Sequence, residues 1–96
     1  MKMTKYIVTH PTNKRSLETM IKMPIEKNVL FKNLKSNCTS DADWVRSWLV
    51  PEQEKLYCEW NAKDPESIRN IFERLGGTTP IESIDEMHIV EANLFK

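Results

Sequence analysis

Two strand-like segments separated by a short polar loop constrain the fold more than any other part of the chain. Residues 44–50 (WVRSWLV) and residues 55–61 (KLYCEWN) are rich in β-branched and aromatic side chains, which favour strands. The four residues between them (PEQE) have the length and composition of a hairpin loop. The sequence therefore predicts two antiparallel, neighbouring strands in the middle of a 96-residue chain.

A well-marked helix follows this hairpin. Asp64 is a good N-cap, and Pro65 fits the first helical position, where a missing N–H costs nothing. Gly76-Gly77 ends the segment, and Gly76 can take the left-handed conformation that closes a helix. Between these signals, apolar side chains recur at helical spacing and predict one core-facing stripe: Ile68, Ile71, Phe72 and Leu75.

The flanking segments complete a β-α-β-β-α-β order. Residues 6–9 (YIVT) predict the first strand, and Pro11 places His10 at the end of that strand. Helical spacing favours a main helix over residues 25–35, after a helical turn or two that Pro24 interrupts. The last strand is expected over residues 84–90, with residues 87–90 (MHIV) as its most apolar part.

This order is typical of an α+β ferredoxin-like sandwich, in which both helices cover one face of a four-stranded antiparallel sheet. We expect residues 1–96 to form one such domain, with strand order 4-1-3-2. Alternate strand residues point to opposite faces, so some rings of the hairpin must lie on the face without helices. Such an aromatic face is large for a monomer, and we therefore expect a homodimer, a dimeric α/β barrel, that buries it.

Composition narrows the possible partners. Fourteen Lys and Arg balance fourteen Asp and Glu, so the chain has no broad field to attract nucleic acid or a membrane surface, and neither is expected as a partner. The two cysteines, Cys38 and Cys58, lack a CxxC spacing and are interpreted as reduced thiols. No segment resembles a signal peptide or a membrane span, so we expect a cytoplasmic protein.

Four residues carry donor groups that suit a divalent metal such as nickel or zinc: His10, Cys58, Glu59 and His88. The predicted strand order puts them on adjacent strands, where they could converge. The simpler interpretation is structural, with His10 and His88 as surface residues and Cys58 as a small buried hydrophobe. Cys58 lies beside a carboxylate, which raises a thiol pKa, so no nucleophile and no catalytic residue are predicted.

A second group of residues suits an organic ligand. Arg46 shares strand parity with Trp44 and Trp48, which predicts that the three side chains point to one face. Glu59 and Tyr57 share a side of the partner strand. An arginine–glutamate pair among these rings and Trp60 would line a cavity inside the dimeric barrel and could hold a small planar or anionic ligand. The alternative is a cross-strand ion pair beside interface aromatics.

Several of these segments also carry a family resemblance. The stretches WVRSWLV (44–50), KLYC (55–58), PESIR (65–69) and GGTTP (76–80) resemble the small nickel-responsive protein family, formerly a domain of unknown function. The resemblance implies a ferredoxin-like, dimeric α/β barrel and divalent nickel binding. Relatives often carry His in place of Arg46, an acidic residue in place of Asn61 and His in place of Ile71. Arginine offers no lone pair to a metal.

Three functions remain open from the sequence. The leading hypothesis is a non-enzymatic protein that binds a small ligand or a divalent metal of the nickel type. The first alternative is a cofactor-independent enzyme of the monooxygenase or isomerase type, which rests on analogy with other dimeric α/β barrels. The second alternative is a structural interaction module without a ligand.

Overall fold

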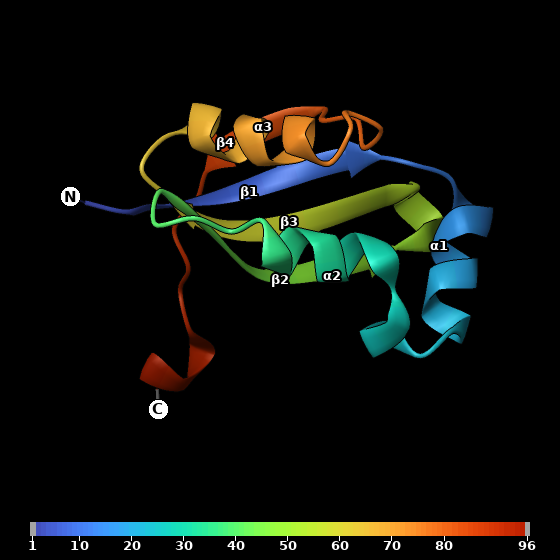
Figure 1. Ribbon diagram of the computed structural model, residues 1–96. Coiled ribbons are helices and arrows are strands. Elements are labelled where there is room, and N and C mark those ends of the chain that lie inside the picture. Colours follow the sequence, from blue (N-terminus) through green and yellow to red (C-terminus); the bar gives the residue numbers. More distant parts are fainter. Residues whose placement is uncertain (1, 96) are drawn as a thin grey trace.

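A computed structural model describes residues 2–95 of the chain (Figure 1). It has one four-stranded antiparallel sheet with the order β2-β3-β1-β4, which confirms the predicted α+β class and strand order. The strands are β1 (Thr4–Pro11), β2 (Ala42–Val50), β3 (Lys55–Ala62) and β4 (Ser83–Glu86). The α-helices are α1 (Lys14–Lys22), α2 (Val29–Ser36) and α3 (Pro65–Arg74). Among residues 2–95, no helix is long and apolar enough to cross a membrane.

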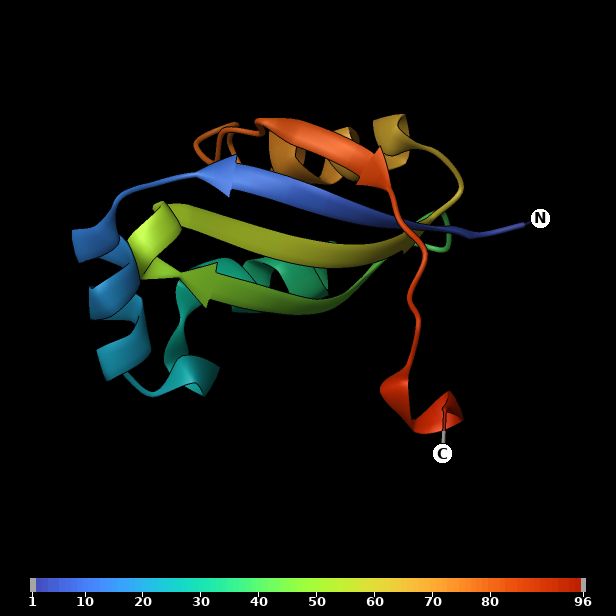
Figure 2. The same cartoon turned by 180° about the vertical axis from the view of Figure 1, so that it is seen from behind.

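The helices are not spread evenly around the sheet. Helices α2 and α3 cover one face, while α1 lies at one end beside the loop between β2 and β3 (Figure 1). Seen from behind, the other face carries no helix formed by residues 2–95, and of these residues only the segment after β4 crosses in front of it towards β2 (Figure 2). We refer to this helix-free side, with Ile7 of β1, Trp48 of β2 and Glu59 of β3, as the open face.

The predicted hairpin is present, but its register contains an irregularity. Trp44 lies opposite Trp60 and Arg46 lies opposite Glu59, so Val45 is an extra residue at a β-bulge. A bulge reverses the alternation of side chains along its strand. The predicted shared face of Trp44, Arg46 and Trp48 is therefore wrong: Trp44 lies on the helix side, and the other two lie on the open face.

The helix after the hairpin is confirmed. Asp64 caps it, since its Oδ1 accepts a hydrogen bond from the Ser67 backbone N–H at 2.8 Å. The earlier helical region differs from the prediction. The segment before Pro24 forms the nine-residue helix α1, and residues 25–27 form a 3₁₀ turn instead of starting the main helix. Helix α2 begins only at Val29, because the Asn28 side chain accepts from the Phe31 N–H and caps it there.

The predicted last strand is also wrong in its second half. Strand β4 pairs with β1 from Ser83 to Glu86, and one further backbone bond joins the Met87 N–H to the Lys5 carbonyl. Strand β1 begins at Thr4, so an antiparallel continuation has almost no partner left. Residues 87–91 lie outside any strand, and their apolar side chains are free for another role.

The hydrophobic core lies between the sheet and helices α2 and α3. Trp60 is fully buried at its centre, with its ring 5.8 Å from that of Phe72 in an edge-to-face arrangement. Trp44 stacks on Phe31 of α2, with ring centroids 5.5 Å apart. The core therefore takes two of the four hairpin aromatics and leaves two, Trp48 and Tyr57, for the open face.

Candidate functional site

A cluster of three charged side chains lies on the open face. Glu59 of β3 is almost completely buried, with 2% of its surface exposed, although it points away from the helices. Its Oε2 accepts a hydrogen bond from Lys5 Nζ at 2.5 Å, and its Oε1 lies 3.0 Å from Arg46 Nε. We call Lys5, Arg46 and Glu59 the charged cluster. Two cations share one carboxylate, so the cluster carries a net positive charge.

Each partner of Glu59 is positioned by the sheet. Arg46 lies directly opposite Glu59 in the β2–β3 register. Lys5 of β1 lies opposite Asn61 of β3, and its Nζ also donates a hydrogen bond to Asn61 Oδ1 at 2.9 Å. The Arg46 side chain remains 64% exposed. Its Nε makes the contact with Glu59, and the guanidinium carries two further nitrogens with N–H groups. The cluster thus offers N–H donors to an anion on its solvent side.

A hollow of about 490 Å³ adjoins the charged cluster. Its floor is the open face of the sheet, and one wall is the segment after β4, which crosses that face (Figure 2). Trp48, with 42% of its surface exposed, and Tyr57 contribute rings, while the Tyr57 hydroxyl donates to Gln53 Oε1. The remaining lining is mostly apolar and consists of Ile7, Val50, Met87, Ile89 and Glu91.

The structure brings together four of the six residues predicted for an organic ligand. Arg46, Trp48 and Tyr57 line the hollow, and Glu59 lies among them. Trp44 and Trp60 lie on the other face. The Trp44 Nε1–H donates to Ser47 Oγ at 2.9 Å, and within the described residues the buried Trp60 Nε1–H has no partner.

The predicted metal donors are spread over both faces. His10 is buried on the helix side, where its Nδ1–H donates to the Pro80 carbonyl at 2.9 Å. Burial lowers the pKa of His10, and the hydrogen bond to Pro80 opposes that shift only in part, so the ring is neutral near pH 7. Cys58 is also buried there, and burial raises the pKa of its thiol to about 11, which keeps it protonated.

The other two metal candidates are separated from these. Glu59 lies on the open face, and His88 lies beyond β4 with its side chain 87% exposed and Nε2 4.0 Å from Glu86 Oε1. Among residues 2–95, no three His, Cys, Asp or Glu side chains are grouped closely enough to hold a metal. The donor set around Glu59 does not fit nickel either, because both carboxylate oxygens already contact cations.

Two contributors to the site were missed by sequence reasoning. Lys5 was placed before the first strand, although alternation from Ile7 would have put its side chain on the same face. The sequence predicted residues 87–90 as part of the last strand. The apolar side chains of this segment do contact the rest of the protein, but they line the hollow and do not pair with a strand.

The fold and this site define a small α+β protein whose sheet has one covered face and one open face with a charged, aromatic hollow. The chain belongs to the SCO4226-like family of nickel-responsive proteins, whose sequence model matches residues 6–87. A search of curated proteins and a search of solved structures found no match.

Proposed function

We propose that this member of the nickel-responsive family is a binding protein for a small organic anion with an apolar body. The observation that carries the proposal is the charged cluster, in which two cations face one buried carboxylate beside an aromatic hollow. Glu59 neutralises one of the two positive charges of Lys5 and Arg46, and the other can attract an anionic ligand. Arginine suits this role because its planar guanidinium forms paired hydrogen bonds with carboxylates.

The hollow supports the apolar half of the proposal. Its volume of about 490 Å³ lies within the range of small-molecule sites, which is roughly 300–1,000 Å³. Trp48 and Tyr57 would contact a planar body, and Arg46 would hold its charged end. Binding is favoured over catalysis because the groups most suited to proton transfer or nucleophilic attack, His10 and Cys58, are buried on the opposite face.

The proposal includes a ferredoxin-like dimer in which a second copy covers the open face. Trp48 is 42% exposed there, and the last residues of the chain expose Val90, Leu94 and Phe95 by 73–75%. Such a surface favours association, and a chain without net charge does not repel its copy. We expect sedimentation equilibrium to give the mass of two chains, and Trp48→Glu to give the mass of one with an unchanged circular dichroism spectrum. A monomeric parent protein would contradict this part.

Ligand binding is tested by calorimetry with 2-naphthoate and its neutral analogue 2-naphthalenemethanol. We expect the parent protein to prefer the carboxylate, and Arg46→Gln to weaken 2-naphthoate binding about tenfold or more, since a hydrogen bond to a charged group contributes about 1.5–3 kcal/mol. Binding of the alcohol should change little.

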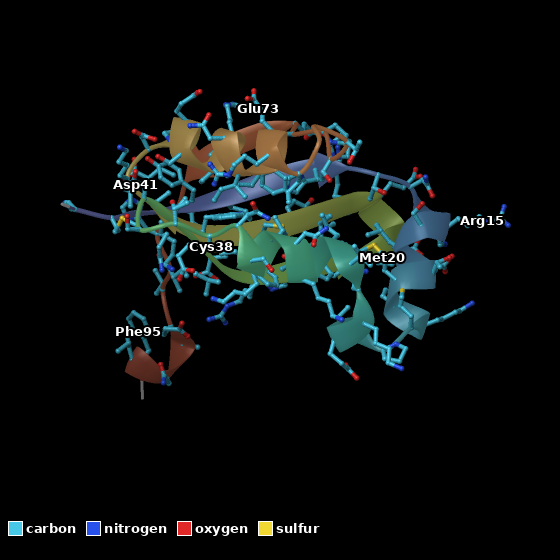
Figure 3. The ribbon with its side chains drawn as sticks, in the orientation of Figure 1. Arg15, Met20, Cys38, Asp41, Glu73 and Phe95 are labelled. Carbon is cyan, nitrogen blue, oxygen red and sulfur yellow. The ribbon has the colours of Figure 1, made fainter. Side chains whose placement is uncertain are left out.

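Arg15→Gln is the matched control, because Arg15 points outward from α1 (Figure 3) and does not line the hollow. It removes the same charge and should leave both affinities unchanged. Equal affinity for the two compounds, or equal losses in the two variants, would contradict the proposed anion site.

A further inference from the structure

We infer that Lys5 and Arg46 take the place of a metal ion at Glu59, so that the open face of this chain excludes nickel although its family is described as nickel-responsive. The inference concerns the carboxylate of Glu59 and its two cations. It does not depend on an organic ligand, and it would hold if the hollow bound none.

The occupancy of Glu59 is the first argument. A buried carboxylate needs compensation, which a metal ion or fixed cations can supply. Here the two oxygens are satisfied separately, Oε2 by Lys5 Nζ at 2.5 Å and Oε1 by the Arg46 guanidinium at 3.0 Å. A metal would need the same oxygens, and it would have to displace at least one cation to reach them.

Electrostatic repulsion is the second argument. Ions that share one carboxylate are only a few ångströms apart, where a dication and a monocation repel each other strongly in a partly buried site. Lys5 also donates to Asn61 Oδ1, so movement of its ammonium out of the site would break two hydrogen bonds, one to Glu59 and one to Asn61. The site therefore disfavours nickel through both its occupancy and its charge.

The lack of a second ligand is the third argument. Nickel favours imidazole and thiolate as well as carboxylate donors. The imidazoles of this chain lie elsewhere, with His10 buried on the helix side and His88 beyond β4. The position best placed to supply an imidazole is residue 46, because it lies directly opposite Glu59 across the β2–β3 ladder.

These arguments give a gain-of-binding experiment on untagged protein, with NiCl₂ as the titrant in calorimetry. We expect the parent protein to show no nickel binding at Glu59, that is, no binding that Glu59→Gln abolishes. The double variant Lys5→Gln/Arg46→His removes both cations and adds one imidazole, and we expect its nickel affinity to rise about 10- to 100-fold, the scale on which groups around a metal change its affinity. Lys5→Gln/Arg46→Gln removes the same charges without adding a ligand and should gain far less.

The outcomes separate clearly. A folded double variant that gains no nickel affinity would overturn the inference, and so would parent binding that is lost on Glu59→Gln. Parent binding that survives Glu59→Gln agrees with it, because Glu59 is then not a ligand. Should the double variant fail to fold, Arg46→His alone decides the question, with a gain expected over Arg46→Gln. Calorimetry with 2-naphthoate is a separate readout, so failure of the anion proposal cannot be mistaken for failure of this one.

Discussion

Replacement of Trp60 by alanine is expected to lower the free energy of unfolding by about 3–5 kcal/mol, the usual cost of truncating a large aromatic residue in a core. Trp60 has no exposed surface, and its ring contacts Phe72 of α3 from the middle of the sheet. The cavity would lie where the sheet and helix meet and could not collapse easily. Urea unfolding followed by far-ultraviolet circular dichroism measures the loss without depending on tryptophan fluorescence.

Trp60→Phe is the control for this prediction. It keeps an aromatic ring against Phe72 and removes an indole N–H that is buried without a partner among the described residues. Removing the unsatisfied N–H is favourable and offsets part of the free energy lost with the smaller ring. We therefore expect the free energy of unfolding to fall by less than about 1.5 kcal/mol. A loss below about 1 kcal/mol for Trp60→Ala would show that the residue is not a core residue and would restore it as a candidate for ligand contact.

The hairpin and the helix that follows it were predictable because their signals are local. The hairpin combines two β-rich segments with a loop of suitable length, and α3 has a capping aspartate, a proline at its first position and glycines after its end. The Arg46–Glu59 pair was also predictable, since it joins facing positions of that hairpin. Local chemistry decides each of these features, and tertiary contacts only reinforce it.

The division of the tryptophans between two faces was not predictable in the same way. It depends on the bulge at Val45, where two residues of β2 oppose one of β3. Strict alternation placed Trp44 with Arg46, whereas the bulge returns Trp44 to Phe31 in the core. A register shift of one residue changes every later assignment, and the sequence contains no local mark of where it occurs.

The end of the chain shows a different limit. Residues 87–90 have the composition of a strand, but composition does not reveal whether a partner strand extends that far. Because β1 begins at Thr4, the ladder ends and the segment becomes a wall of the hollow instead. Lys5 was missed for a related reason: its part in the charged cluster comes from pairing with β3, which is more than fifty residues away in sequence.

Replacement of Lys5 by methionine is the second change with a large expected effect, a loss of about 2 kcal/mol of unfolding free energy. Removing one partner of a fully buried ion pair costs about 3–5 kcal/mol, and partial exposure of Lys5, at 30%, reduces that figure. The cost arises from Glu59, which would stay buried with Arg46 as its one remaining cation. Methionine keeps most of the aliphatic stem, so packing is largely preserved.

A double-mutant cycle with Glu59→Gln separates this effect from a loss of packing. In the Glu59→Gln background no buried carboxylate remains to be compensated, so Lys5→Met should cost less than about 1 kcal/mol, and the coupling energy should exceed about 1 kcal/mol. Lys35→Met provides the surface comparison, since Lys35 and Asp43 form a more exposed pair at 3.6 Å that contributes about 0.5 kcal/mol or less. Urea titrations at one protein concentration measure all variants. Equal costs of Lys5→Met in both backgrounds would mean that Lys5 stabilises the sheet by its stem alone, and that the charge on Glu59 is compensated without it.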